Sequence, residues 1–307
     1  MRALMNRGGG EVAVDLAELP TPEPAPSEAV VGVGAVAVNR GELRLLGMRP
    51  HGWRPGQDVA GVIVVAAADG SGPAKGTRVV AWPEQEGWAE QVAVPTSHLA
   101  PLAPEVSFAQ AATLPIAGVT ALRLLRLGGD LSGQRVLVTG AAGGVGRFVV
   151  ELAAGSGAEV AGVAGSPERA AGLADLGAGA IVHDIEEADG PFDLILESAG
   201  GASLEASIRL VAPGGTIAVY GNSSNTSAQV SFGDFRGRAG ARIVAFFVYE
   251  SGEPPTFGED LKLLADMVAE GSLHPQIGLE APWTEANSVF AALAGREVNG
   301  KAVLLVE

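Results

Sequence analysis

The chain has 307 residues, which corresponds to about two domains of ordinary size. Asp and Glu number 35 against 20 Lys and Arg, and the resulting formal charge of −15 argues against nucleic acid and membrane partners. Cysteine is absent, which excludes disulfides, thiolate catalysis and zinc sites built on sulfur. No apolar run reaches the length of a membrane span, and residues 1–10 lack the apolar run of a signal peptide, so we expect a cytoplasmic protein.

The first 110 residues have the pattern of short strands separated by turns rich in Pro and Gly. Alternating or β-branched apolar residues mark each strand, as expected for an all-β or barrel-like unit. The predicted strands are residues 29–38, 59–68, 77–82 and 88–94.

Beyond residue 115 the pattern changes to strands that alternate with helices, which predicts a parallel sheet built from βαβ units. The predicted strands are residues 134–139, 159–164, 180–183, 192–197, 216–220 and 242–248, and the predicted helices are 147–154, 167–176 and 202–210. Two further helices are expected at 259–270 and 284–294. The last strand, 302–306, is expected to return to the first domain because a lone terminal strand needs a partner.

The most informative motif is a glycine-rich turn between a buried strand and a helix, Val136-Leu-Val-Thr-Gly-Ala-Ala-Gly-Gly-Val-Gly146. Glycine lets the backbone approach a pyrophosphate, and the N-terminus of the helix offers free N–H groups and the positive end of the helix dipole. The motif therefore indicates a dinucleotide site, although a tight strand–helix turn without a ligand would use the same residues.

The end of the following strand bears on the choice of cofactor. No acid stands there to bind a ribose 2′-hydroxyl, as NAD sites usually require. Ser166 could donate to a 2′-phosphate, and Arg169 could pair with it as a bidentate fork. Ser166 is also a good helix N-cap before Pro167, and both interpretations can hold together. The pattern favours NADPH over NADH.

Five motifs, in this order along the chain, resemble the zinc-independent quinone oxidoreductases of the medium-chain dehydrogenase/reductase superfamily. They are Val36-Ala-Val-Asn39, Pro55-Gly-Gln-Asp-Val-Ala-Gly61, Leu114-Pro-Ile-Ala-Gly-Val-Thr-Ala121, Gly140-Ala-Ala-Gly-Gly-Val-Gly146 and Asn299-Gly-Lys-Ala-Val-Leu304. The resemblance implies an α/β protein with a GroES-like, partly open β-barrel catalytic domain (1–114 and 251–307) and a Rossmann domain with a doubly wound parallel sheet (115–250). Cofactor and substrate are expected in the cleft between the two domains.

The resemblance also implies hydride transfer from NADPH to a small quinone or conjugated enone, and it assigns site residues by position. Asn39 would face the nicotinamide end of the cleft and is the best candidate for a polar contact to the acceptor. The other implied cofactor contacts are Thr120 near the nicotinamide, Gly143, Gly144 and Val145 at the pyrophosphate, Ser166 and Arg169 at the 2′-phosphate, Asn222, the backbone of Phe246, Phe247 and Val248, and Lys301 near the phosphates.

The chain also departs from the family. A tyrosine that some members carry after the segment at Asn39 is absent, and the acid there is Glu42. His183 and Asp184 follow Gly177–Val182, where the family often has a tyrosine near the adenosine, and an acid there could weaken binding of the 2′-phosphate.

No metal is expected, because the four histidines show no ligand spacing and Asp58 stands where zinc-dependent relatives have a Gly-His-Glu turn. Asp58 is interpreted as a turn residue. The candidate substrate-pocket residues are Arg40, His51, Trp53, Trp82 and Phe247, each of which could equally be a core or surface residue.

Two other functions stay open: an enoyl reductase that acts on an acyl or polyketide intermediate, and a noncatalytic NADPH-binding protein. Tyr249 could donate a proton, but it could also pack at a subunit interface. We expect a homodimer, because the family pairs the edge strand of the Rossmann sheet, here residues 243–249, across a two-fold axis and an uncovered apolar edge invites aggregation.

Overall fold

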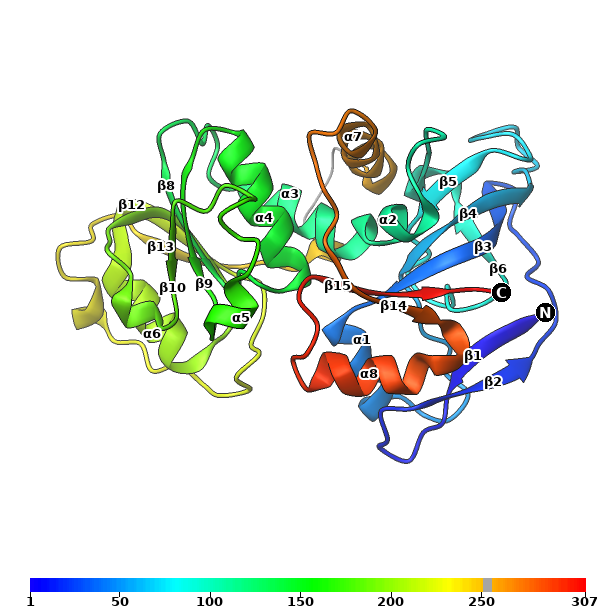
Figure 1. Ribbon diagram of the computed structural model, residues 1–307, viewed down its shortest axis with the longest axis horizontal. Helices are drawn as coiled ribbons and strands as arrows, with labels where there is room; N and C mark the ends of the chain where they lie inside the picture. Colours follow the sequence, from blue (N-terminus) through cyan, green and yellow to red (C-terminus); the bar gives the residue numbers. More distant parts are fainter. Residues whose placement is uncertain (251–255) are drawn as a thin grey trace. The chain divides into compact units, whose positions relative to one another are not determined.

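The computed structural model describes residues 1–250 and 256–307 (Figure 1). The chain divides into two compact units, Met1–Val119 with Glu253–Glu307 (unit 1) and Thr120–Gly252 (unit 2). The first boundary lies five residues beyond the expected residue 114. The extra residues form a π-helix, η2 (Leu114–Gly118), whose Ile116 N–H donates to Asp58 of unit 1 at 2.8 Å.

Unit 1 is built on a sheet of seven strands that is mostly antiparallel. In spatial order the strands are β14 (Ile277–Pro282), β15 (Lys301–Leu305), β3 (Glu28–Val38), β4 (Asp58–Val65), β5 (Arg78–Ala81) and β7 (Leu99–Pro101), and β6 (Gln91–Pro95) also pairs with β3. A separate hairpin joins β1 (Arg2–Asn6) and β2 (Val14–Glu18). This sheet, with the terminal strand β15 paired to β3, confirms the barrel-like domain and the return of the last strand.

The described residues of unit 1 form four α-helices: α1 (Arg40–Met48), α2 (Phe108–Ala112), α7 (Phe257–Ala269) and α8 (Ala286–Ala294). Short 3₁₀ turns precede β7 (Thr96–His98, η1) and α8 (Trp283–Glu285, η6). The core contains Trp88, Trp283 and Phe290, which are almost completely buried, and Trp88 stacks on Phe290 with ring centroids 5.2 Å apart. Valines of β3, β4 and β6 complete this core because alternate residues of each strand face it.

Unit 2 is a parallel sheet with the spatial order β10 (Ala180–Val182), β9 (Glu159–Val163), β8 (Arg135–Thr139), β11 (Phe192–Glu197), β12 (Val211–Val219) and β13 (Arg242–Ala245). The order reverses direction at β8, as in doubly wound dinucleotide-binding sheets. Helix α4 (Gly144–Gly155) packs on β8 and β9, and α6 (Gly201–Leu210) packs on β11 and β12 (Figure 1). The predicted Rossmann domain is therefore confirmed.

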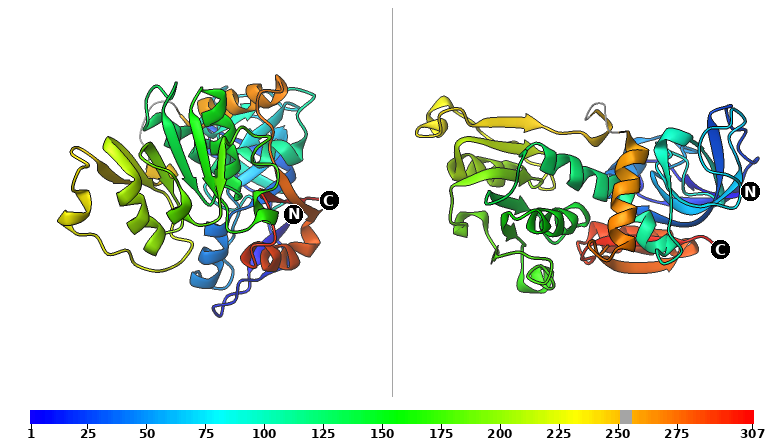
Figure 2. Two further views of the ribbon diagram at one scale, coloured as in Figure 1. Left: turned by 60° about the vertical axis from the view of Figure 1, so that its left-hand side comes forward. Right: turned by 90° about the horizontal axis from the view of Figure 1, so that it is seen from above.

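The remaining elements of unit 2 are short. They are α3 (Val119–Arg126, which begins at the boundary), α5 (Pro167–Ala170) and the 3₁₀ turns η3 (Ile185–Glu187), η4 (Phe232–Phe235) and η5 (Val248–Glu250). The helix expected at 167–176 ends six residues early, and positive φ angles at Gly172 (79°) and Gly177 (99°) accompany the turns that replace it. Strand β13 is likewise shorter than expected and lies at the margin of the sheet (Figure 2).

We expect Gly61→Ala to destabilise the protein by at least about 2 kcal/mol, because overpacking against backbone atoms cannot relax easily. A Cβ atom at Gly61 in β4 would lie 2.0 Å from the carbonyl oxygen of Gly32 in β3. Gly41→Ala is the matched control, since a Cβ there meets nothing within 4 Å. Urea unfolding of both variants measures the difference, and equal midpoints would contradict the prediction.

Candidate functional site

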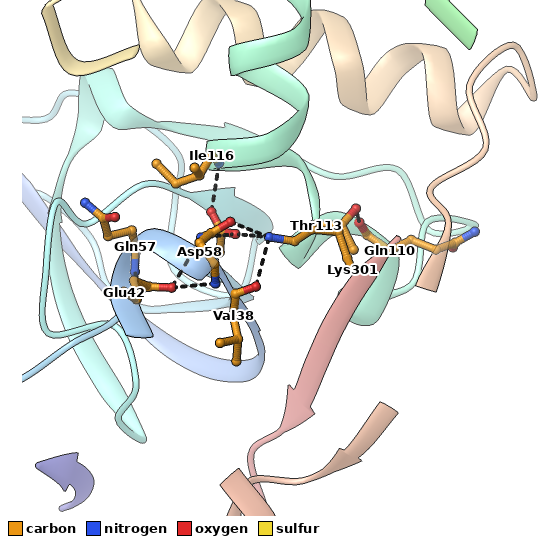
Figure 3. Close-up of polar contacts among 9 residues, drawn as sticks. Val38, Glu42, Gln57, Asp58, Gln110, Thr113, Ile116 and Lys301 are labelled. Carbon is orange, nitrogen blue, oxygen red and sulfur yellow. Dashed lines mark hydrogen bonds and ion pairs between the residues drawn. The ribbon is translucent and has the colours of Figure 1, made fainter. Parts of the chain in front are cut away.

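A buried cluster of polar side chains links three separate segments of unit 1 (Figure 3). We call it the Asp58 cluster: Asn39, Glu42, Asp58 and Lys301. Asp58 begins β4 and is completely buried, and Lys301 begins β15 and is 3% exposed. Asp58 is therefore part of a strand and an ion pair, which corrects its interpretation as a turn residue.

The carboxylate of Asp58 accepts hydrogen bonds on both oxygens. Oδ1 accepts from the Ile116 N–H at 2.8 Å, and Oδ2 accepts from Lys301 Nζ at 2.8 Å and from Asn39 Nδ2 at 2.9 Å. Lys301 Nζ also donates to Asn39 Oδ1 at 2.6 Å and to the carbonyl of Val38 at 3.5 Å. A buried charge requires this degree of pairing, because an unpaired ion away from water is very costly.

Glu42 completes the cluster from helix α1. Its Oε2 accepts from the backbone N–H of Asn39 at 2.9 Å and from Asn39 Nδ2 at 3.2 Å, while its Oε1 accepts from the Gln57 N–H at 3.0 Å. Burial, and then the negative charge of Asp58, raise the pKa of Glu42 to about 8. Near neutral pH Glu42 therefore holds a proton, and the cluster carries one negative and one positive charge.

Two predicted site residues, Asn39 and Lys301, use their hydrogen-bond donors within this cluster. Both Nδ2 hydrogens of Asn39 are donated within the cluster, so the amide has no spare donor for an acceptor molecule. Lys301 has its three ammonium hydrogens directed at Val38, Asn39 and Asp58. The structure thus gives both residues an internal structural role, and their contacts with cofactor or acceptor stay predictions.

The predicted substrate-pocket residues of unit 1 lie in different surroundings. Arg40 is exposed and donates to the Leu293 carbonyl at 3.2 Å, and His51 is exposed with Nδ1 3.1 Å from the Arg7 carbonyl. Trp53 packs against the core, and Trp82 is buried and stacks on Phe257 at 3.8 Å between ring centroids.

A cavity of about 670 Å³ in unit 1 is lined by residues that are adjacent in sequence to His51, Trp53 and Trp82. Its lining includes Gly52, Arg54 and Pro83, together with the carboxylates of Glu23, Glu28, Glu84 and Glu86. Four carboxylates around one arginine do not match a quinone or an acyl chain, so the predicted acceptor has no matching cavity here.

In unit 2 the glycine-rich turn has the predicted form. Gly140 has φ of +64°, Gly143 is the N-cap of α4, and no side chain caps the helix. In the described part of the chain the N–H groups of Gly144 and Val145 have no acceptor, which leaves them available to an anion. A Cβ at Gly146 would lie 2.4 Å from the Gly140 carbonyl oxygen, so only glycine fits. These residues fit a pyrophosphate.

The predicted adenosine side of the site lies at the end of β9. Ser166 is the N-cap of α5, and its hydroxyl oxygen accepts from the Arg169 N–H at 3.4 Å. Its hydroxyl also holds the pKa of Glu168 below its usual range. His183 Nδ1 lies 2.8 Å from the Ala164 carbonyl, and the Asp184 carboxylate caps η3 by accepting from the Glu186 N–H. The N-cap interpretation of Ser166 is thus confirmed, and its 2′-phosphate contact stays a prediction.

The other predicted cofactor residues of unit 2 lie in three places. Thr120 is buried in α3, and Asn222 is exposed in the loop after β12 with Oδ1 accepting from Ser224 Oγ at 3.1 Å. Phe246 and Val248 are buried, whereas Phe247 is 60% exposed. Their roles at a cofactor stay predictions.

Helix α1, which carries Glu42 of the Asp58 cluster, was not predicted from the sequence. The sequence does contain a signal for the start of this helix. Asn39 is followed three residues later by the acid Glu42, which is the pattern of a helix N-cap and its N3 partner. The Glu42 carboxylate does accept from the Asn39 N–H. The pairing of Asp58 with Lys301 had no local signal, since 243 residues separate them.

Glu42→Gln is expected to remove a pH dependence of stability. The folded pKa of about 8 lies above the ordinary value of 4.5, so between these values the folded chain keeps a proton that the unfolded chain has lost. The free energy of unfolding of the wild type therefore falls as pH rises through this window. The wild type should lose stability relative to Glu42→Gln over that range in denaturant titrations, whereas Glu105→Gln, at an exposed position, should follow the wild type. If the free energy of unfolding of the wild type, minus that of Glu42→Gln, stays flat or rises with pH, the prediction is wrong.

Comparison with known proteins shows what the chain is similar to. A family model described as zinc-binding dehydrogenase matches residues 144–266. The chain has no cysteine, and the described residues contain no group of three or more His, Cys, Asp or Glu that could hold a metal. Among the described residues there is also no helix long and apolar enough to cross a membrane.

Similarity extends over the whole chain. It is 34% identical over 97% of its length to the spectinabilin polyketide synthase system protein NorB of Streptomyces orinoci, of which it spans only 14%. It is 27% identical to the quinone oxidoreductase of Mus musculus over 97% of this chain and 95% of the relative. The solved quinone oxidoreductase from Coxiella burnetii superposes with a TM-score of 0.85 at 25% identity, covering 100% of this chain and 99% of the other. Together with the fold of both units, these findings show that the chain is similar to the quinone oxidoreductases of the medium-chain dehydrogenase/reductase superfamily.

Proposed function

We propose that this chain is an NADPH-dependent oxidoreductase that transfers a hydride to a quinone or conjugated enone without using zinc. The observation that carries the proposal is the turn between β8 and α4, where the N–H groups of Gly144 and Val145 have no acceptor in the described part of the chain and Gly146 admits no side chain. Similarity to the quinone oxidoreductases supports the choice of reaction.

Bound NADPH would supply the hydride from its nicotinamide C4. The chain's own part in the proposal is to bind and orient that group. The N-terminus of α4 would neutralise the pyrophosphate with backbone N–H groups and the helix dipole. The end of β9 carries no acid that would repel a 2′-phosphate, since Ala164-Gly165-Ser166 follows the strand. This is why we propose NADPH rather than NADH.

Reduction of a quinone or enone also needs a proton, and the described residues suggest no dedicated donor. Asn39 has no spare donor, and the proton on Glu42 is completely buried. Tyr249 lies in η5 and is 52% exposed. Water therefore reaches this position and can supply a proton there as readily as the tyrosine hydroxyl can. We therefore propose that the developing oxyanion takes its proton from water.

A second function, reduction of an enoyl thioester, is favoured by the similarity to NorB and other polyketide synthase proteins. The test is stopped-flow oxidation of NADPH by the pure chain with a naphthoquinone, an aliphatic enone and an enoyl thioester. We expect the quinone or the enone to react fastest. Fastest turnover of the thioester would assign the second function, and tight NADPH binding without turnover of any acceptor would indicate a noncatalytic NADPH-binding protein.

Gly146→Ala should weaken NADPH binding by at least about tenfold, because the added methyl group displaces the turn that presents the N–H groups. The Cβ would lie 2.4 Å from the Gly140 carbonyl oxygen and 2.7 Å from Ala141 Cα. Gly155→Ala in the same helix is the control, since a Cβ there meets nothing within 4 Å. Calorimetric titration with NADPH measures both. Unchanged affinity in folded Gly146→Ala, or no binding by the wild type, would remove the basis of the proposal.

We also propose that the chain forms a homodimer through β13. This strand ends the sheet of unit 2 (Figure 2). Ile243 (39% exposed), Phe247 (60%) and Tyr249 (52%) leave apolar surface along and beyond it. An edge strand with free backbone groups and exposed apolar side chains favours pairing with a second copy.

Ile243→Glu is expected to convert the dimer to a monomer, because two carboxylates would meet across the two-fold axis without counterions. Light scattering after gel filtration at micromolar concentration gives the mass. Leu263→Glu, at a position that is 45% exposed in α7, should leave the mass unchanged. A wild-type chain that is already monomeric would show the proposal to be wrong.

A further inference from the structure

One buried cation in unit 2 lacks a counterion. Arg147 lies on the first turns of α4, three residues after its first residue Gly144, and is only 5% exposed. Its Nε donates to the Ala142 carbonyl at 3.3 Å, and its Nη2 donates to the carbonyls of Ala171 at 2.8 Å and Arg169 at 3.4 Å. These bonds hold the segment after β9 against the glycine-rich turn.

Carbonyl oxygens satisfy hydrogen bonds, but they do not balance a positive charge. None of the ion pairs among the described residues includes Arg147. Burial, and then the positive charge of Arg169, lower the pKa of the Arg147 guanidinium below its ordinary value. A buried guanidinium that is destabilised by a second positive charge is unfavourable unless an anion compensates it.

The third nitrogen of Arg147 is unused. In the part of the chain that the structure describes, Nη1 makes no hydrogen bond, and it is not among the polar atoms sealed from solvent. The residue beside it is Gly172, with φ of +79°, and a Cβ on Gly172 would lie 3.3 Å from Nη1. The absence of a side chain at Gly172 therefore keeps space open next to a free, charged donor.

The acids of this region are engaged elsewhere. Glu168 accepts a hydrogen bond from the Ser166 hydroxyl, which lowers the pKa of its carboxyl group, and His183 lowers this pKa further. Asp184 accepts from the Glu186 N–H and serves as the cap of η3. Neither carboxylate neutralises Arg147, so an anion at this position has to come from a ligand.

We propose that Arg147 determines cofactor specificity: with Arg169 it forms the subsite for the 2′-phosphate of NADPH, and it orients the α5 segment through the Ala171 and Arg169 carbonyls. Two guanidinium groups match a phosphate dianion in charge and in their forked donors. The inference rests on the proposed function and adds to the expected Ser166 and Arg169 a residue from α4, whose guanidinium donates to the carbonyls of Arg169 and Ala171.

The test measures the contribution of the 2′-phosphate to binding separately from that of the rest of the nucleotide. Calorimetric titrations of the full chain with 2′,5′-ADP and with 5′-AMP give the contribution of the 2′-phosphate as a ratio of affinities. We expect Arg147→Met to weaken 2′,5′-ADP by at least about tenfold while 5′-AMP changes little, because a lost charge-assisted fork to phosphate affects that group alone. Arg236→Met, which removes an exposed arginine of unit 2, should change neither affinity.

Two further measurements keep the test decisive. If circular dichroism shows that Arg147→Met does not fold, Arg147→Lys keeps the charge and loses the fork, and it should still lower the ratio of affinities. Equal losses for 2′,5′-ADP and 5′-AMP, an unchanged ratio, or inorganic phosphate that binds as tightly as 2′,5′-ADP would overturn the inference. Wild-type binding of NADPH is measured in the same series, so failure of the proposed function, with no NADPH bound at all, is distinguished from failure of the subsite.

Discussion

The ion pair between Asp58 and Lys301 is the contact on which the architecture of unit 1 depends. It joins the first residue of β4 to the first residue of β15 across 243 positions of sequence, with both side chains almost completely buried. The same carboxylate accepts the Ile116 N–H of the π-helix. A buried carboxylate tolerates only one arrangement of its partners, because any slip of a strand would leave a charge unpaired. The cluster therefore sets how these segments meet.

Glu42 makes that arrangement possible. With its pKa raised to about 8, its carboxyl group is neutral near pH 7, so the cluster does not bury a second net negative charge beside Asp58. The backbone N–H groups of Asn39 and Gln57 still find acceptors on it. The polar residues that the family motifs place around Asn39 thus serve first to hold α1, β3 and β4 together.

Buried charge is balanced differently in unit 2. Unit 1 balances its buried ions internally, whereas the α4 end of unit 2 presents N–H groups without acceptors and, at Arg147, a buried cation without a carboxylate among the described residues. Folding alone gains nothing from such groups, because desolvating them is costly. Their natural complement is an anionic ligand, and this contrast is why we place the nucleotide on unit 2 and assign a structural role to the Asp58 cluster.

Much of the fold could be predicted from the sequence, because its signals are local. Apolar runs predicted the strands, and the residues around Gly140 and Gly146 predicted the first βα turn. The terminal strand at residues 302–306 was correctly predicted to pair with a strand of unit 1. Ser166 before Pro167 marked a helix start. The length of that helix could not be predicted well, since the turns at Gly172 and Gly177 overrode a helical pattern.

Only the tertiary structure decided which polar side chains meet. Asp58 and Lys301 are distant in sequence, and nothing near either residue specifies the other as its partner. Arg147 stands in a helical pattern as an ordinary exposed arginine would, and its burial becomes visible only once the segment at Ala171 folds back onto α4. The sequence by itself determined the strands, the turns and the glycine-rich motif, because each depends on neighbouring residues. Pairing, burial and the charge balance that separates the two units depend on contacts between distant residues, and these exist only in the folded chain.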